Sequence, residues 1–214
     1  MHRRHLLFTL PIALPLAAAA QNLDLDKTSP VDAVAFYVVP TDGIGENAVA
    51  GIARTLTKAF KLLVKATAWT PSDVNEPFPG SNQYPAEDYL PIGARLARTL
   101  RDVSPRTYFI VVTDRDINSR SQNFRFQYSL HGPMQNTSVL SIARLVHNAD
   151  GSRADAEVIG LRALKMLVRI VGEMRLGWKR SSQPQDVMYA PIMSIDDIDR
   201  MDLEHTLRAQ AARR

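Results

Sequence analysis

Short, wholly apolar runs separated by helical patterns constrain the fold of this chain most. Ala33 to Val39 and Tyr108 to Thr113 are two such runs, and continuous apolar segments of this length predict strands buried on both faces. From Glu46 to Phe60 apolar residues recur at the spacing of an amphipathic helix, and a second strand is expected at Leu62 to Trp69. Strand, helix and strand in this order imply a parallel pair with a right-handed crossover.

The rest of the chain extends this pattern into an α/β (α+β) sandwich. A second helix is expected at Ala86 to Val103, and a fifth strand at Val139 to Val146. Phe124 to Leu130 alternates apolar and polar residues, which is typical of an edge strand with one wet face. A long helix from Asp155 to Arg175 and a segment from Asp186 to Asp199 follow the sheet.

The first twenty residues are typical of an export signal. They combine a basic start, an apolar run over 6–16 and small residues before Gln21, and the run is too short to span a membrane comfortably. We expect cleavage before Gln21, a tether over 21–32 and a single domain over 33–214, located in the periplasm or outside the cell without a stable membrane span. An uncleaved membrane anchor is the alternative.

Composition excludes several classes of function. The formal charge falls from +4 to +2 when Arg3 and Arg4 leave with the leader, and no basic stripe interleaved with aromatic residues is visible, so no nucleic-acid partner is expected. The chain has no cysteine. Disulfide bonds, thiol catalysis, thiolate zinc sites and iron–sulfur clusters are therefore excluded.

Several short segments in series resemble the archaemetzincins, a metzincin branch of zinc metallopeptidases. The resemblance covers about Val34 to Asp199 and rests on four elements: Gln83-Tyr84 before the second helix, Phe109 to Ile117, the Phe-x-Phe of Phe124 and Phe126, and the Ser-x-x-Arg-Leu that ends at Leu145. It implies a metzincin-like mixed, mostly parallel five-stranded sheet with an antiparallel edge strand, two backing helices, a long active-site helix and a methionine turn.

In that family the long helix carries His-Glu-x-x-His-x-x-Gly-x-x-His. Two histidines four residues apart reach one zinc ion, and the glutamate is the general base for a zinc-bound water. With Gly177 as the glycine of the motif, the two helical ligand positions fall on Ile170 and Met174, the base on Val171 and the third ligand on Arg180. Met188 and Tyr189 correspond to the methionine turn.

The resemblance thus implies a peptidase scaffold without its reactive groups. We expect no catalytic residue, no cofactor and a cleft filled by hydrocarbon at the former ligand and base positions. The protein is interpreted as an exported, zinc-less pseudopeptidase that binds an extended peptide or another exported protein, with Phe124, Phe126 and Tyr128 on the peptide-binding edge strand. The alternative is an active zinc peptidase with an atypical ligand set.

Other polar groups have simpler explanations. His131, His147 and His205 lack the spacing that would suit one metal ion, so local hydrogen bonding is expected. Ser194 followed by Asp197 predicts a helix cap rather than a metal site. Asp114 and Asp116 flank a turn and are expected to bond local backbone rather than calcium.

Overall fold

The structure is a computed structural model that describes residues 34–121 and 124–212, and its contacts divide the chain into two compact units. Within the described residues, the sheet unit comprises 34–57 and 62–144, and the helical unit comprises 58–61 and 145–212. The expected signal at 1–20 and tether at 21–32 lie outside the described residues. The single domain at 33–214 stays a prediction.

The sheet unit contains the expected five-stranded sheet. Its strands run in the order β2-β1-β4-β7-β6, with parallel pairing throughout except for β6, which is antiparallel to β7 and forms an edge. The bounds are β1 Phe36–Pro40, β2 Val64–Ala66, β4 Tyr108–Thr113, β6 Ser129–Gly132 and β7 Thr137–Ser141. A separate two-stranded sheet pairs β3 Tyr84–Pro85 with β5 Ile117–Asn118. The predicted fold class is therefore confirmed.

Helices of the sheet unit cover the sheet where the apolar patterns predict them. Helix α1 spans Glu46–Phe60, as expected, and its last turn from Lys58 belongs to the helical unit. The second predicted helix is shorter and divided into a 3-10 turn, η3 Ala86–Tyr89, and α2 Pro91–Ala97, with a further turn, η4 Pro133–Gln135, after β6. The division falls at Pro91, which cannot donate a backbone hydrogen bond and therefore starts a helix.

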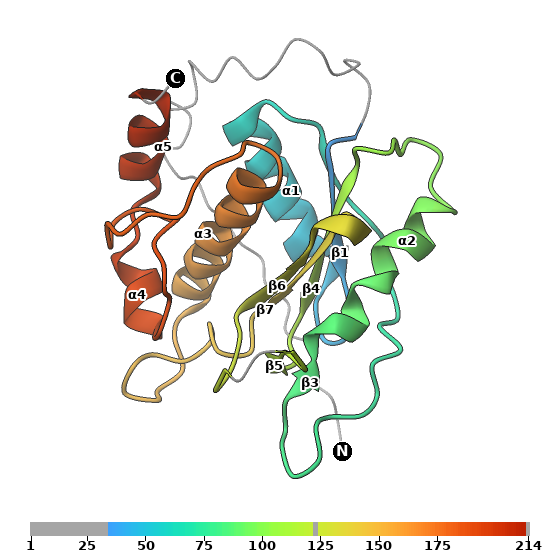
Figure 1. Cartoon of the computed structure of the whole chain (residues 1–214), viewed down its shortest axis with the longest axis horizontal. Coiled ribbons are helices and arrows are strands. Elements are labelled where there is room, and N and C mark those ends of the chain that lie inside the picture. The colour runs from blue at the N-terminus through green and yellow to red at the C-terminus, as the bar shows by residue number, and fades with distance from the viewer. Residues whose placement is uncertain (1–33, 122–123, 213–214) are drawn as a thin grey trace. The chain divides into compact units, whose positions relative to one another are not determined.

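The α2 face of the sheet is closely packed. Figure 1 shows α2 running alongside this sheet, and a β-carbon placed on Gly93 of α2 would lie 2.0 Å from Thr137 Oγ1. Buried residues of alternate sheet positions and of η3 and α2 form one core cluster, which includes Val39, Tyr89, Ile92, Val111 and Val139. Every residue of β1, β4 and β7 is buried, including the polar residues of β7, so little space is left on this side of the sheet.

Three predicted strands have the wrong bounds. The second is limited to β2, and the fifth is β7, which ends at Ser141. The edge strand starts at Ser129 rather than at Phe124, so that Phe124, Phe126 and Tyr128 precede β6. The physical reason is that side-chain amides, rather than a neighbouring strand, bind the backbone carbonyls of residues 124 and 125.

The helical unit contains the predicted long helix. Helix α3 spans Ala156–Met174, followed by α4 Ile195–Arg200 and α5 Leu203–Ala212. The predicted cap of α4 is confirmed, since the backbone N–H of Ser194 donates to the Asp197 carboxylate at 2.9 Å. Within the described part of the chain, no helix combines the length and apolar character that a bilayer crossing needs.

Candidate functional site

The helical ligand and base positions of the resemblance lie on a buried part of α3. Ile170 and Val171 are fully buried and Met174 is half-buried. Ile170 and Met174 are one helical turn apart and therefore share a face. None of these side chains offers the nitrogen or oxygen ligands that zinc takes on a helix of this kind.

Gly177 follows three residues after the end of α3 and is the glycine of the motif that the resemblance implies. Its backbone has a φ of +66°, a left-handed conformation that favours glycine. The N–H of Trp178 turns back and donates to the carbonyl of Gly172 at 2.9 Å. The Trp178 indole lies so close to Gly172 that a β-carbon there would be 2.2 Å from Cε3, and it also packs edge-on against Phe60. Trp178 is thus a core residue of the helical unit.

Arg180, at the third ligand position of the resemblance, forms an ion pair with a residue of α3. The Arg180 guanidinium donates to Glu173 Oε1 at 2.8 Å. Desolvation raises the pKa of the Glu173 carboxyl and lowers the pKa of Arg180. The loop after Gly177 is therefore bound to the helix by an ion pair, at the position that the resemblance assigns to the third ligand.

Met188 and Tyr189, the residues that the resemblance assigns to the methionine turn, lie in a turn that hydrogen bonds fix from several sides. Met188 is fully buried, Tyr189 is half-buried, and the N–H of Met188 donates to Asp186 Oδ1 at 2.9 Å. The carbonyl of Met188 accepts from the Ser181 N–H at 2.9 Å, so the turn pairs with the segment that follows Arg180. The α3 helix, the third ligand position and the methionine turn are therefore joined into one site region.

A row of buried cations on α3 holds this region and was not predicted from the sequence. Arg169 donates to the carbonyls on both sides of Met188, at 2.6 Å to Val187 and 2.7 Å to Tyr189. Lys165 donates to the carbonyls of Ile198 and Asp199, both at 3.0 Å, and thereby satisfies the C-terminal end of α4. Burial lowers the pKa of the Lys165 ammonium group.

Arg162 completes the row and uses all five of its donors. It binds Asp199 through two bonds of 2.7 and 2.6 Å, and it also donates to the carbonyls of Leu145 and His147 and to the side chain of Asn148. The sequence signal was the spacing of 162, 165 and 169, which places all three on one side of a helix. It was hidden because charged residues on a helix are usually solvated.

The segments that carry the resemblance in the sheet unit converge on a second polar cluster. Arg144 forms two hydrogen bonds with Asp116, at 2.8 and 2.7 Å, and its guanidinium lies 4.2 Å above the ring of Phe126. Gln83 contacts the same carboxylate at 3.3 Å, and Tyr84 donates its N–H to the Asp116 carbonyl. Asp116 thus pairs with a distant arginine rather than only with local backbone.

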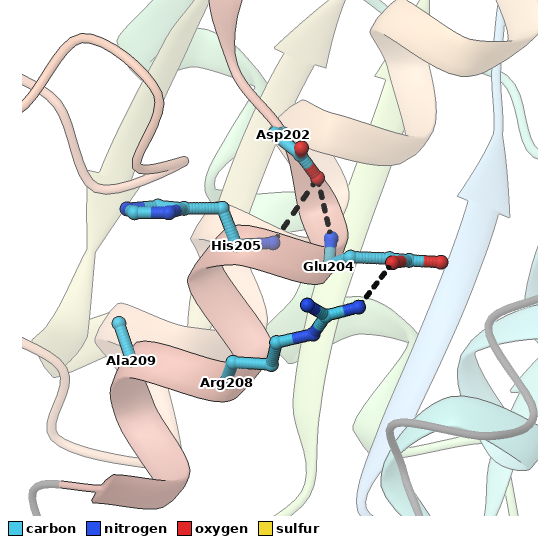
Figure 2. Close-up of a pocket in the computed structure, with 5 residues that line it drawn as sticks. All are labelled: Asp202, Glu204, His205, Arg208 and Ala209. Atoms are coloured by element: carbon cyan, nitrogen blue, oxygen red, sulfur yellow. Dashed lines mark hydrogen bonds and ion pairs between the residues drawn. The ribbon is translucent and has the colours of Figure 1, made fainter.

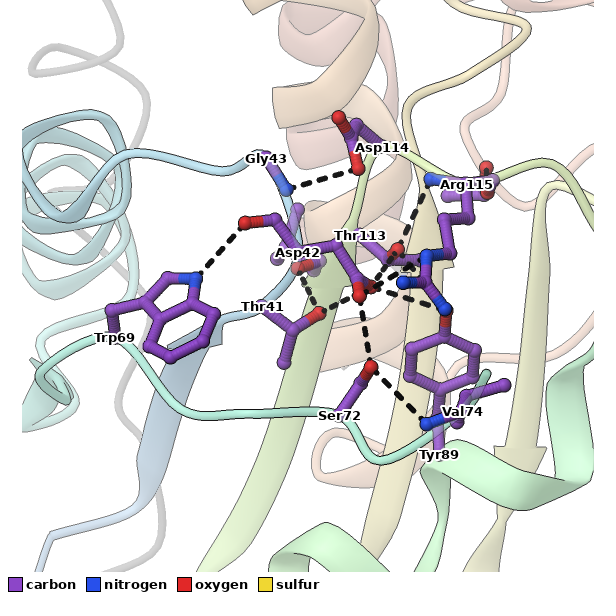
Figure 3. A network of polar contacts seen from close by, with 12 residues as sticks. Thr41, Asp42, Gly43, Trp69, Ser72, Val74, Tyr89, Thr113, Asp114 and Arg115 are labelled. Atoms are coloured by element: carbon purple, nitrogen blue, oxygen red, sulfur yellow. Dashed lines mark hydrogen bonds and ion pairs between the residues drawn. The ribbon is translucent and has the colours of Figure 1, made fainter. Parts of the chain in front are cut away.

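A third network surrounds Asp42 at the carboxyl ends of β1 and β4. Figure 3 shows its carboxylate among the hydroxyl groups of Ser72 and Thr113, which donate at 2.8 and 2.6 Å, and the Arg115 guanidinium at 3.2 Å. Desolvation by burial is the main reason why the pKa of Tyr89, which also donates to Asp42, is raised. Since Asp42 is already surrounded by donors, the network fixes loops of the sheet unit.

A shallow pocket of about 460 Å³ lies beside α5 (Figure 2). Asp202 accepts from the first backbone N–H groups of α5, Glu204 pairs with Arg208 one turn later, and His205 contacts Gln183 at 3.4 Å. The charged groups of the pocket therefore interact with their own neighbours, as on a solvated helix face.

These features together define an archaemetzincin-like metallopeptidase fold. The chain is similar to the zinc-dependent peptidase from Methanocorpusculum labreanum (strain Z), with a TM-score of 0.67 and 18% identity over 82% of this chain and 99% of that chain. It is also similar to archaemetzincin from Archaeoglobus fulgidus, with a TM-score of 0.55 and 26% identity over 78% of this chain and 91% of that chain. No family profile and no curated protein matches the sequence.

The comparison corrects the expectation that no cofactor is involved. A zinc-dependent peptidase shares the fold, and the fold therefore points to zinc. The residues at the motif positions do not fit that metal, because Ile170, Met174 and Arg180 supply two apolar side chains and a cation. Among residues 34–121 and 124–212, no group of three or more His, Asp or Glu side chains lies together as a metal site.

The local hydrogen bonding expected of the histidine side chains is found at His131 and at His205, whose Nε2 lies 3.4 Å from Gln183 Oε1. His131 Nδ1 lies 2.8 Å from Ser138 Oγ, and the His147 carbonyl accepts from Arg162. His205 lies beside the α5 pocket. The fold and the residues at the positions that the resemblance assigns to the motif thus disagree about zinc.

Proposed function

We propose that this protein is a non-catalytic binding module built on a peptidase fold. One feature supports the proposal: the positions that the resemblance assigns to the two helical ligands, the base and the third ligand hold Ile170, Met174, Val171 and Arg180. A zinc peptidase needs a general base and an activated water, and neither an isoleucine–valine pair nor a guanidinium provides them. The arrangement of α3 and the methionine turn supports retention of the scaffold for another use.

The edge of the sheet supplies the binding surface in this proposal. β6 is the terminal strand of the five-stranded order and pairs on one side with β7. Such an edge can accept an extended segment by strand addition, in which main-chain hydrogen bonds give affinity. The partner is an extended peptide or an extended segment of another exported protein.

An active zinc peptidase with an atypical ligand set is the second candidate. It is favoured by the zinc-dependent peptidase of the same fold. The two candidates differ in one measurable property, which is hydrolysis of peptide bonds.

The deciding experiment is digestion of a peptide library by the purified full-length chain, with and without a chelator. The binding module gives no chelator-sensitive cleavage. Stoichiometric zinc in protein purified without added metal, together with cleavage that the chelator abolishes, would establish the second candidate. Metal content is measured on the same sample, because bound zinc without cleavage is compatible with a module that does not hydrolyse peptides.

Export is part of the proposal and has its own test. The sequence pattern over 1–20 supports it. Expression with the native leader, followed by fractionation and mass spectrometry, should give a mature chain that begins at Gln21 in the periplasmic or extracellular fraction. An intact N-terminus in the membrane fraction would support the uncleaved anchor instead.

A further inference from the structure

The segment before β6 is held by side chains rather than by a strand. The Asn118 side-chain amide donates to the carbonyl of Phe124 at 2.8 Å, and the Gln83 amide donates to the carbonyl of Arg125 at 3.0 Å. The two amides also bind each other, at 3.0 Å from Asn118 Nδ2 to Gln83 Oε1. The backbone of residues 124 and 125 is therefore fixed before any partner binds.

Neighbouring contacts extend this fixed backbone into the edge strand. The Phe126 ring lies beneath Arg144, whose guanidinium is itself held by two bonds to Asp116. Gln127 donates its N–H to the Ile117 carbonyl at 3.1 Å, and the Tyr128 carbonyl accepts from Ser141 at 2.8 Å. The chain thus passes from residue 124 to β6 with a hydrogen bond or ring contact at every residue from 124 to 128.

The side chains of Phe124 and Arg125 remain outside these contacts. Phe124 is 54% exposed and Arg125 is exposed. The other three arginines of the stretch 115–144 each have a carboxylate partner: Arg115 pairs with Asp42, Arg120 with Asp88 and Arg144 with Asp116. Among the described residues, no carboxylate forms an ion pair with Arg125. A fixed backbone therefore presents one apolar ring and one uncompensated cation.

We propose that Phe124 and Arg125 are a specificity element that selects extended peptides carrying an acidic residue beside an apolar one. The inference rests on the proposed function, since it assigns a preference to the peptide that adds to β6. Phe124 lies five residues before Ser129, so an extended peptide of about ten residues, at about 3.3 Å per residue, is long enough to reach from β6 to the element.

Charge complementarity determines the acidic preference. Asn118 and Gln83 bind the carbonyls of this segment in the free protein, so the segment is already ordered. Peptide binding therefore does not have to cost the conformational entropy of ordering it. An ion pair between exposed groups is worth little, so a two- to five-fold preference for an acidic over a neutral peptide is expected at low salt. The preference should decrease as ionic strength rises.

The test uses fluorescently labelled ten-residue peptides with a β-forming core of valine and threonine. A set of peptides places aspartate, asparagine or lysine beside leucine or serine at one end, and binding to the full-length chain is followed by anisotropy. The wild-type chain should bind the aspartate–leucine peptide about two- to five-fold more tightly than the asparagine–leucine peptide. Arg125→Gln should remove this preference, and Arg125→Glu should transfer it to the lysine peptide.

Two further variants separate the contributions. Phe124→Ser should lower the affinity for the leucine peptides until it approaches the affinity for the serine peptides. The preference for aspartate over asparagine should remain in this variant. Arg54→Gln is the matched control, because Arg54 is an exposed arginine on α1, and the same loss of charge there should leave every affinity unchanged.

The outcomes distinguish this inference from the proposed function. Failure of every peptide to bind would overturn the proposed function, and the inference with it. Binding without an acidic preference, or with a preference that persists in Arg125→Gln, would overturn the inference alone. A preference lost equally in Arg54→Gln would show a general effect of net charge and would also overturn it.

Discussion

Gly172 shows how one residue can depend on tertiary packing. Glycine inside a helix ordinarily destabilises it by up to about 1 kcal/mol relative to alanine. In α3 the missing β-carbon instead provides the space that the Trp178 indole occupies. The backbone contact from Trp178 to Gly172 and the ring contact with Phe60 add to the same packing.

Gly172→Ala is therefore expected to destabilise the protein by about 1–3 kcal/mol, since the indole must move to accommodate a β-carbon 2.2 Å from Cε3. Urea unfolding followed by circular dichroism measures the change. Gly51→Ala in α1 is the matched control, because the nearest atom there is the flexible end of Arg54 at 3.9 Å, and this variant should gain up to about 1 kcal/mol. Equal effects of the two substitutions would contradict the role of Trp178.

Arg162 is the corresponding case among charged residues. Its side chain is only 3% exposed, and its loss would leave buried carbonyl acceptors unpaired. Arg162→Met should lower the free energy of unfolding by about 2–4 kcal/mol. Arg200→Gln, which removes a 59% exposed arginine from its pair with Asp197, should change it by less than about 0.5 kcal/mol. Denaturant titrations of both variants give the comparison, and a small effect at Arg162 would disprove its structural role.

At the scale of elements, α3 is an amphipathic helix only in part. Apolar residues such as Ile170 and Val171 are buried, and so are the cations Arg162, Lys165 and Arg169. The cations donate to carbonyl groups at the end of α4 and around Met188. The helix therefore organises the C-terminal segment through hydrogen bonds as well as through apolar packing.

Lys165 makes this arrangement sensitive to alkaline pH. Burial lowers its pKa in the folded state below the ordinary 10.5, so the unfolded chain holds the proton over a range where the folded chain has lost it. Stability attributable to Lys165 must consequently rise as the pH increases from the folded pKa towards 10.5. Urea unfolding of the wild type and of Lys165→Met across this range should show the wild type gaining relative to the variant, and a constant difference would exclude the linkage.

At the scale of the whole molecule, the chain forms two compact units that share α1. The helix starts in the sheet unit and its last turn belongs to the helical unit. Because one hydrogen-bonded helix continues through both, unfolding of either unit removes part of α1. The single domain at 33–214 remains a prediction.

Unfolding is thus expected to be a single cooperative transition. In a Trp69→Phe variant the remaining Trp178 reports on the helical unit, in which it is buried. Its fluorescence transition should coincide with the loss of far-ultraviolet circular dichroism, and the calorimetric and van't Hoff enthalpies should have a ratio of about 1. Two separated transitions would show that the units unfold independently.

The sequence by itself determined the class of fold, the long helix α3 and the glycine after it, Gly177. Local periodicity specifies strands and helices, and only glycine readily takes the backbone angle found at Gly177. With Gly177 as the glycine of the motif, the alignment that the resemblance implies also places residues without zinc ligands or a general base at the motif positions.

Only the tertiary structure decided what replaces those groups. The structure pairs Arg180 with Glu173, packs Trp178 against Gly172 and binds the Phe124 carbonyl to the Asn118 side chain. Their partners have no periodicity that a sequence would reveal. The edge strand starts at Ser129 rather than at Phe124 for the same reason, since side-chain amides of Gln83 and Asn118 bind the carbonyls of residues 124 and 125.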